Sequence, residues 1–207
     1  RNIQIFKHIR EGLDEANKVL GKERGEAPDA VGTGKRFSHM LAIAPNASSS
    51  IIMGNTSPSV EPYRANAYRQ DTLSGSSLNK NKHLDAIVKE EAKNHKEGWY
   101  DEVWSSIIAN DGSVQHLDWM SDWLKDVFKT SMEIDQRWVV QHAADRQEYI
   151  DQAQSINLFF RPDSNIKYIH AVHFQAWKQG LKTLYYCRSE KIGKARSEEH
   201  TSELQSH

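Results

Sequence analysis

Cysteine is nearly absent from this sequence, in which Cys187 is the single one among 207 residues. One thiol excludes a disulfide within the chain and a metal site built from several cysteines, and it fits a reducing compartment. The chain also lacks a run of the roughly 18 apolar residues that a membrane-spanning helix needs, and it opens without a signal-peptide pattern. We therefore expect a cytoplasmic protein with no membrane partner and no metal site.

An excess of charge of one sign is also missing. The chain has 27 basic and 28 acidic residues, a net charge of -1. This balance provides no field that would recruit nucleic acid or an anionic membrane, so any phosphate group must be recognised locally. Hydrophobic residues make up 38% of the chain, and they recur in periodic clusters rather than being diluted as in a disordered tail. The composition predicts one folded domain or a piece of a larger one.

Both ends of the sequence differ from those of a natural protein. Arg1 takes the place of an initiator Met, and a helical pattern follows it directly. Residues 196–207 (RSEEHTSELQSH) resemble the translation of a sequencing-library adapter, and we exclude them from fold prediction. An authentic polar tail is the alternative. We expect a fragment whose natural part is residues 1–195.

Periodicity predicts the order of elements through residue 150. Apolar residues recur at steps of three and four over residues 2–24, which predicts an amphipathic helix. Residues 37–44 suggest a short buried strand, and residues 54–77, rich in Gly, Asn, Ser and Pro, suggest an irregular packed segment. Successive helices are predicted over residues 82–150. The side chains expected on their buried faces are Trp119, Trp123, Phe128, Ile134, Trp138 and His142.

The last part of the chain has the order strand, helix, strand. Residues 155–160 and 181–187 are the predicted strands, and a helix that includes Ile166 and is closed by Gly180 lies between them. This order calls for a right-handed crossover between parallel strands. The fold class is therefore α/β with a helical insertion. Cys187, at the end of the second strand, is expected to be an ordinary buried or half-buried thiol.

The segment Pro45–Ser50 is a candidate phosphate cradle. A helix start leaves main-chain N–H groups unpaired and carries a partial positive charge. The small residues Asn46, Ala47, Ser48 and Ser49 would let an anion approach those groups without help from Lys or Arg. An ordinary helix with a serine cap explains the same pattern, and on the pattern alone it is the better explanation.

Tyr185 and Tyr186 are a second candidate site. Adjacent residues of a regular strand face opposite ways, so one of the two would normally be buried and the other exposed. Two stacked phenols would need a backbone that departs from regular pleating. Because a phenol can lose a proton and an electron together, a stacked pair could relay a radical. Two structural aromatic residues are the plainer alternative.

His170 and His173 are a third candidate pair, since residues three apart share a helix face and could bind a metal. No Cys or carboxylate near them completes a ligand set. Packing or surface histidines are therefore the better explanation.

Taken together, these segments resemble the C-terminal portion of the large, catalytic subunit of class I ribonucleotide reductase, in its bacterial and phage form. The resemblance covers essentially residues 1–195. Four stretches carry it, in family order: Arg36–Ser38 with Ala42–Ser49; Met53–Asn55 with Glu61–Tyr63 and Leu73–Gly75; Asp151–Leu158; and Ala176–Gly180 with Leu181–Tyr186.

The resemblance implies a fold and a function. The family fold is a ten-stranded α/β barrel, of which this piece would supply the C-terminal part with a helical insertion. The implied activity is the reduction of ribonucleoside diphosphates to deoxyribonucleoside diphosphates. Asn46, Ala47, Ser48 and Ser49 match the residues that hold the substrate diphosphate. Tyr185 and Tyr186 match the tyrosine pair that relays the radical, which favours class I over the cobalamin-dependent class.

The resemblance also implies partners outside this chain. They are a small (beta) subunit that generates the radical with a metal, thioredoxin or glutaredoxin as reductant, nucleotide effectors bound elsewhere, and a second copy of the large subunit. The radical cysteine and the reducing cysteine pair of the family cannot lie here, because Cys187 follows the tyrosine pair. We therefore expect no cofactor bound to this piece and no activity from it alone. A cobalamin-dependent reductase fragment and a non-enzymatic helical binding module are the rival interpretations.

Overall fold

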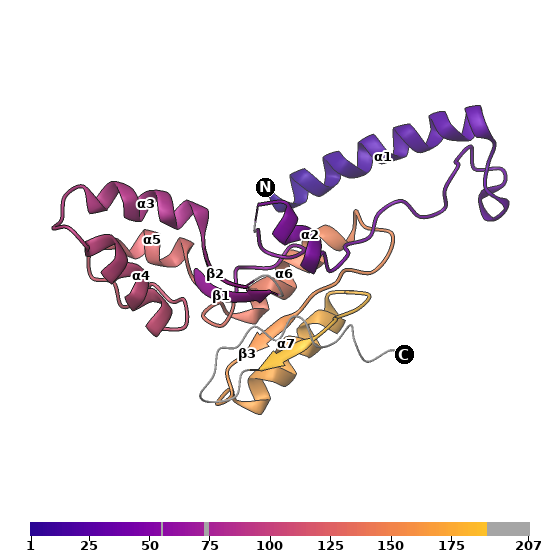
Figure 1. Ribbon diagram of the computed structural model, residues 1–207. Helices are drawn as coiled ribbons and strands as arrows, with labels where there is room; N and C mark the ends of the chain where they lie inside the picture. The colour runs from indigo at the N-terminus through magenta and orange to yellow at the C-terminus, as the bar shows by residue number, and fades with distance from the viewer. Residues whose placement is uncertain (55, 73–74, 190–207) are drawn as a thin grey trace. The chain divides into compact units, whose positions relative to one another are not determined.

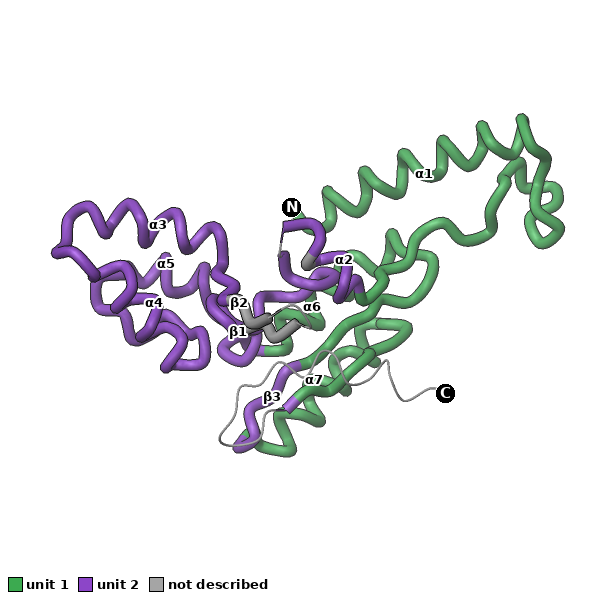
Figure 2. Tube along the Cα trace, viewed as in Figure 1, with its two compact units in different colours: residues 1–45, 136–158, 164–188 green, residues 46–135, 159–163, 189–207 purple. Residues whose placement is uncertain are grey.

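The computed structural model describes residues 1–54, 56–72 and 75–189 (Figure 1). They form two compact units, each made of separate stretches of the chain (Figure 2). Unit 1 comprises Arg1–Pro45, Gln136–Leu158 and Ser164–Arg188. Unit 2 comprises Asn46–Asp135, Phe159–Asp163 and, from the last stretch, Ser189. The expected adapter-derived segment, residues 196–207, lies outside the described residues.

Three long helices build unit 1. They are α1 (Asn2–Arg24), α6 (Gln136–Gln147) and α7 (Ile166–Lys178), and the contacts run from α1 to α6 and from α6 to α7. A short 3₁₀ turn, η1 (Pro28–Ala30), follows α1. The helices predicted over residues 2–24 and after residue 165 are confirmed, and the Asn165 side chain caps α7 by accepting the N–H of Lys167.

The predicted buried strand over residues 37–44 is wrong. The described structure has one isolated parallel bridge there, between Ile43 and Gln154, and the residues are exposed or half-buried. The reason is that main-chain pairing is confined to Leu41 and Ile43, which bond to the main chain of residues 152–155, while side chains bind the residues before them. The Asn17 side chain donates to the carbonyl of Phe37 (2.8 Å) and accepts the N–H of the same residue (2.8 Å).

The predicted parallel crossover is seen in its hydrogen bonds, although its strands are shorter than expected. Strand β3 (Leu158–Phe160) pairs with β4 (Cys187–Ser189). Just before them, the N–H of Tyr185 donates to the carbonyl of Ile156 and the N–H of Leu158 donates to the carbonyl of Tyr186, both at 2.8 Å. Residue numbers rise together on the two segments, which is the pattern of parallel strands.

Unit 2 contains a hairpin where an irregular segment was predicted. Strands β1 (Ala67–Thr72) and β2 (Gly75–Lys80) pair antiparallel, with Ala67 opposite Lys80 and Thr72 opposite Gly75. Ser, Asn and Gly are poor strand formers, so the composition of residues 54–77 concealed the hairpin. Residues 73 and 74, part of one stretch that carries the family resemblance, lie outside the described residues.

The described helices of unit 2 are α2 (Ala47–Ile52), α3 (Lys82–Ala92), α4 (Trp99–Ala109) and α5 (Asp122–Val127), so the prediction of successive helices is confirmed. Residues of α3 and α4 contribute to one apolar core, and Leu124 of α5 packs against it. Phe128 is buried and Trp119 packs against the core, as expected. Trp123 and Trp138 are 71% and 63% exposed and His142 is exposed, so their predicted burial is wrong. The core consists of Ala67, Leu84, Val88, Val103, Trp104, Ile107, Val114, Leu117, Met120 and Phe128.

A buried asparagine joins the hairpin to the helices of unit 2. Asn66, 1% exposed, donates from its side chain to the carbonyls of Gly112 (3.0 Å) and Phe128 (2.7 Å). Its Oδ1 accepts from the side chain of Asn81 (3.0 Å), and the Asn81 side chain in turn caps α3. Buried amides are kept in place by such complete pairing.

Among the described residues, the strands form two separate two-stranded sheets. None of the described helices combines the length and the apolar character needed to cross a membrane.

Candidate functional site

The predicted phosphate cradle forms the first turn of α2. Asn46 adopts a left-handed conformation (φ 52°, ψ 29°) and precedes Ala47, the first helical residue. Asparagine is one of the few residues other than glycine that visit this conformation readily. Asn46, Ala47, Ser48 and Ser49 are all exposed. The sequence prediction of a helix start at this place is therefore confirmed, while its role in binding is a separate question.

Three main-chain N–H groups at this helix start precede the first hydrogen bond of the helix. The first bond of the helix runs from the N–H of Ser50 to the carbonyl of Asn46 (2.9 Å), so the N–H groups of the three residues before Ser50 point out of the helix end. The side chain of Asn46 makes no capping bond, and the Ser50 hydroxyl donates to the carbonyl of Ala47 (2.7 Å). An exposed first turn with small side chains and N–H groups outside the helical ladder can accept an oxyanion.

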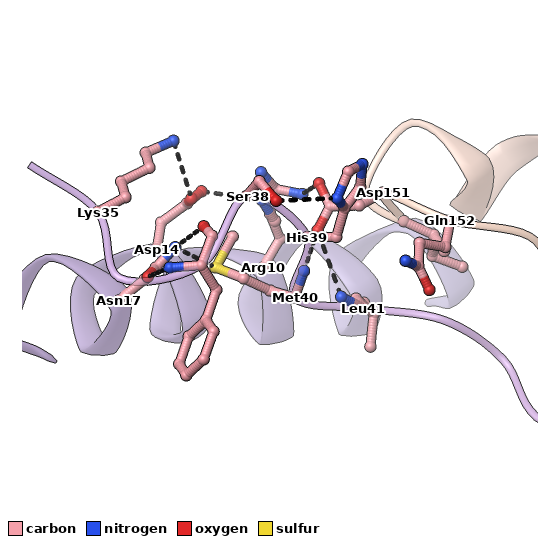
Figure 3. A network of polar contacts seen from close by, with 12 residues as sticks. Arg10, Asp14, Asn17, Lys35, Ser38, His39, Met40, Leu41, Asp151 and Gln152 are labelled. Atoms are coloured by element: carbon pink, nitrogen blue, oxygen red, sulfur yellow. Dashed lines mark hydrogen bonds and ion pairs between the residues drawn. The ribbon is translucent and has the colours of Figure 1, made fainter. Parts of the chain in front are cut away.

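The chain that leads to this turn is held by Asp151 (Figure 3). One oxygen of the Asp151 carboxylate accepts the main-chain N–H of Met40 (2.8 Å) and of Leu41 (3.3 Å). The other oxygen accepts a hydrogen bond from Arg10 of α1 (2.5 Å), and Arg10 also pairs with Asp14 (2.9 Å). The Asp151 side chain is 13% exposed, so this ion pair is largely shielded from water.

The protonation of Asp151 reflects these contacts. Burial by itself would raise the pKa of the Asp151 carboxyl. The N–H of Met40 and the guanidinium of Arg10 outweigh burial, because both stabilise the charged form, and the pKa is lowered. Asp151 is therefore an anion at neutral pH.

The tyrosine pair is the second site, and the rings lie close together. The ring centroids of Tyr185 and Tyr186 are 4.1 Å apart and their planes are inclined by 53°. Both side chains are about half exposed, and both residues lie just before β4, outside its regular pairing. The backbone departs from regular pleating here, as predicted for two phenols in contact, but the rings are tilted rather than stacked.

The two phenols influence each other. The pKa of the Tyr185 hydroxyl is raised, first because a hydrogen bond with the Tyr186 side chain favours the neutral phenol and then because a charged Tyr186 would repel a second negative charge. Arg188 has the opposite effect on Tyr185. The Arg188 guanidinium lies over the Tyr186 ring, 5.1 Å from its centroid. Two phenols in contact, with a cation above one ring, can exchange a proton and an electron over a short distance.

The remaining sequence candidates are the pair His170 and His173, and Cys187. His170 is exposed and stacks on Phe174, and Nδ1 of His173 bonds to the carbonyl of Ile169 (2.8 Å). The described residues contain no group of three or more His, Cys, Asp or Glu placed to hold a metal. Cys187 is exposed, so its predicted burial is wrong. The reason is that β4 begins at Cys187 and has one paired neighbour in the described sheet.

Sequence reasoning missed Arg10 and Asp151. Asp151 was seen only as part of a motif, and the two residues are 141 positions apart, so local periodicity carries no signal for their pairing. The two candidate sites lie in different compact units, the α2 turn in unit 2 and the tyrosine pair in unit 1.

Comparisons with known proteins agree on one family. Residues 22–187 match the model of the family described as "Ribonucleotide reductase, barrel domain". The large subunit of ribonucleoside-diphosphate reductase from Invertebrate iridescent virus 6 is 60% identical over 196 residues, which are 94% of this chain and 20% of that protein. The large subunit from Danio rerio is 41% identical over 157 residues, 75% of this chain and 19% of that protein.

A solved structure agrees. The alpha subunit of the class Id ribonucleotide reductase of Actinobacillus ureae superposes with a TM-score of 0.81 at 40% identity, over 92% of this chain and 34% of that one. The chain thus spans about a fifth of the length of the curated relatives cited above.

Proposed function

This chain belongs to the ribonucleotide reductase family, in its barrel domain, and on that basis we propose that its parent protein reduces ribonucleoside diphosphates. In the overall reaction a ribonucleoside diphosphate and a dithiol give a deoxyribonucleoside diphosphate, a disulfide and water. The dithiol and the cysteine that carries the transient radical belong to parts of the parent outside this chain. The names of the viral and animal relatives, ribonucleoside-diphosphate reductase large subunit, support the proposal.

In this proposal Asn46, Ala47, Ser48 and Ser49 hold the substrate diphosphate. Support comes from the exposed first turn of α2, whose N–H groups precede the first helical hydrogen bond, as an anion site at a helix start requires. The main chain supplies the donors, and the small side chains leave room for the phosphate oxygens. The hydroxyls of Ser48 and Ser49 add further donors.

Tyr185 and Tyr186 relay the radical between the small subunit and the catalytic cysteine. In each step a phenol loses its proton and one electron together and later regains both, so the pair is unchanged after a turnover. The observation that carries the proposal is the contact of the two rings, with centroids 4.1 Å apart, in a chain of this family. A relay of phenols points to class I, whose radical starts in another subunit, rather than to the cobalamin-dependent class.

Membership of the ribonucleotide reductase family also supports proposals on the fold, the partners and the location of the parent protein. We place residues 1–195 in the C-terminal part of a ten-stranded α/β barrel with a helical insertion. The partners proposed are a small (beta) subunit with a metal-generated radical, thioredoxin or glutaredoxin, nucleotide effectors at sites outside this chain, and a second large subunit. We propose a cytoplasmic location, which suits an exposed thiol at Cys187. The relatives cited include viral, animal and bacterial proteins, so a bacterial or phage form stays a prediction.

The class is tested with the full-length large subunit. We expect turnover of a ribonucleoside diphosphate to require the small subunit and to be unaffected by adenosylcobalamin. Turnover that requires adenosylcobalamin, without a small subunit, would assign the chain to the rival class. The 207-residue chain alone is expected to be inactive under both conditions.

A further inference from the structure

The backbone at the tyrosine pair has one residue more than its neighbouring segment. In a regular parallel ladder, one residue bonds to both neighbours of the residue opposite it. Its N–H donates to the carbonyl of the neighbour before, and its carbonyl accepts the N–H of the neighbour after. Here the opposite residue is Asn157, and its neighbours are Ile156 and Leu158. The N–H that bonds to the carbonyl of Ile156 belongs to Tyr185, but the carbonyl that accepts from Leu158 belongs to Tyr186 (both 2.8 Å). Two tyrosines therefore stand opposite one asparagine, which is a β-bulge.

The bulge explains why the two rings can meet. In regular pleating, neighbours point to opposite faces. At a bulge the chain advances by two residues while the ladder advances by one, so Tyr185 and Tyr186 are released from that alternation. Their centroids come to 4.1 Å. Bulges are found next to active sites, where they redirect a side chain.

A bulge leaves one N–H without a partner in the ladder, and here that group is the N–H of Tyr186. The side chain of Asn157 supplies the missing acceptor, with Oδ1 3.1 Å from the Tyr186 nitrogen. The Asn157 segment is itself anchored, because Gln154 is 1% exposed and accepts from the buried Arg146 (2.6 Å). The Thr183 hydroxyl donates to the carbonyl of Gln154 (3.3 Å).

We propose that Asn157 is a positioning residue for the radical relay, holding Tyr185 and Tyr186 in ring contact by accepting the N–H of Tyr186. This inference rests on the proposed function of the tyrosine pair. Asn157 takes no part in the electron or proton transfer. Without its oxygen, the bulge would lose the bond that fixes the extra residue, and the backbone would relax toward the regular pattern that separates the rings.

The test uses the full-length large subunit with its small subunit. Asn157→Leu keeps the shape of the side chain but removes the acceptor, Asn157→Ala removes it with less bulk, and Asn157→Asp keeps an accepting oxygen. We expect the first two to lower kcat by about tenfold or more, because a misplacement of about 1 Å between reacting groups can cost about 100-fold. KM for the diphosphate should stay unchanged, and Asn157→Asp should retain most of the turnover.

Asn165→Leu is the matched control. The Asn165 side chain also accepts one main-chain N–H, that of Lys167 (2.8 Å), but it caps α7 and has no bond to the tyrosines. We expect it to leave kcat unchanged.

A second measurement reports on the tyrosine pair directly. The pKa of Tyr185 is raised, and it can be measured as the titration difference between each protein and its Tyr185→Phe version. In Asn157→Leu and Asn157→Ala this pKa should fall toward about 10.

The outcomes separate the inference from the function it rests on. Unchanged kcat in both acceptor-free variants overturns the role of Asn157, as does a fall in kcat while the pKa of Tyr185 stays raised. Should Tyr185→Phe and Tyr186→Phe both turn over at the normal rate, the relay itself is rejected. A fall in kcat with a lowered Tyr185 pKa, rescued by Asp, supports the inference.

Discussion

Arg10 and Asp151, 141 residues apart in the chain, form a hydrogen-bonded ion pair of 2.5 Å within unit 1. Through this pair α1 and the loop after α6 together hold the main chain at Met40 and Leu41. Those residues lead along the sequence to Asn46, where we propose that the diphosphate binds. The pair thus connects a long-range packing contact with the segment that precedes the site.

Asp151→Asn is expected to loosen this segment. An amide has one accepting oxygen and no charge, so it cannot serve Arg10 and two main-chain N–H groups together, and we expect a cost of about 1–3 kcal/mol. Amide hydrogen exchange at Met40 and Leu41 measures it directly. Asp163→Asn is the control, since Asp163 pairs with Arg161 at the surface, with both side chains about 70% exposed, and such pairs contribute little. Unchanged protection in the Asp151 variant would contradict the account.

The same carboxyl predicts a pH dependence. Because the folded pKa of Asp151 lies below its ordinary value of about 3.9, the charged form stabilises the fold. That contribution is complete above the unfolded pKa and is lost as the pH falls through the folded pKa. The difference in unfolding free energy between the native chain and Asp151→Asn should therefore be full at pH 7 and shrink below about pH 4. A difference that stayed constant down to pH 2 would show that Asp151 is not the titrating group.

Gly112→Ala tests the packing of unit 2. Gly112 has φ +79°, and a Cβ there would lie 2.4 Å from the Cβ of Ala65 and 2.9 Å from the nitrogen of Asn66. Gly98 has φ +86° with open space around it, so Gly98→Ala carries the backbone strain alone, about 1 kcal/mol. We expect Gly112→Ala to cost about 1–3 kcal/mol more, seen as a lower urea midpoint. Equal midpoints for the two variants would show that the close approach is absent.

Larger side chains at the first turn of α2 test the proposed diphosphate cradle. Ala47→Leu and Ser48→Leu fill the space in front of the α2 N–H groups, and we expect the Kd of the full-length subunit for a ribonucleoside diphosphate to rise by about tenfold or more. Ala109→Leu, at the exposed end of α4, adds the same side chain away from the turn and should leave Kd unchanged. If both variants of α2 bind normally, the turn is an ordinary helix start, as in the binding-module interpretation.

The sequence predicted the elements whose signals are local. The three- and four-residue steps of residues 2–24 and the turn residues ahead of α7 placed these helices correctly, and the small residues after Pro45 indicated the start of α2. Each depends on the chemistry of consecutive residues, which periodicity and capping reveal. The contact of Tyr185 and Tyr186 was anticipated as a requirement for a relay, and the bulge that permits it came only from the structure.

What the sequence did not predict depends on partners distant in the chain. The buried face of α6 is an example. Its buried residues include Gln136 and Arg146, whereas Trp138 is exposed. Polarity alone assigns the opposite faces, since the burial of a glutamine and an arginine depends on hydrogen bonds from other elements. The hairpin β1–β2 was missed for a related reason, because its strands are held by pairing with each other rather than by strand-forming residues.

The most direct test of the central claim is the steady-state turnover of the full-length subunit, with its small subunit, carrying Tyr185→Phe or Tyr186→Phe. Phenylalanine keeps the ring and has no O–H to lose, so we expect kcat to fall by about 1000-fold or more, a barrier increase of about 4 kcal/mol, with diphosphate affinity retained. Normal turnover in either variant would contradict the claim that radical transfer passes through both phenols.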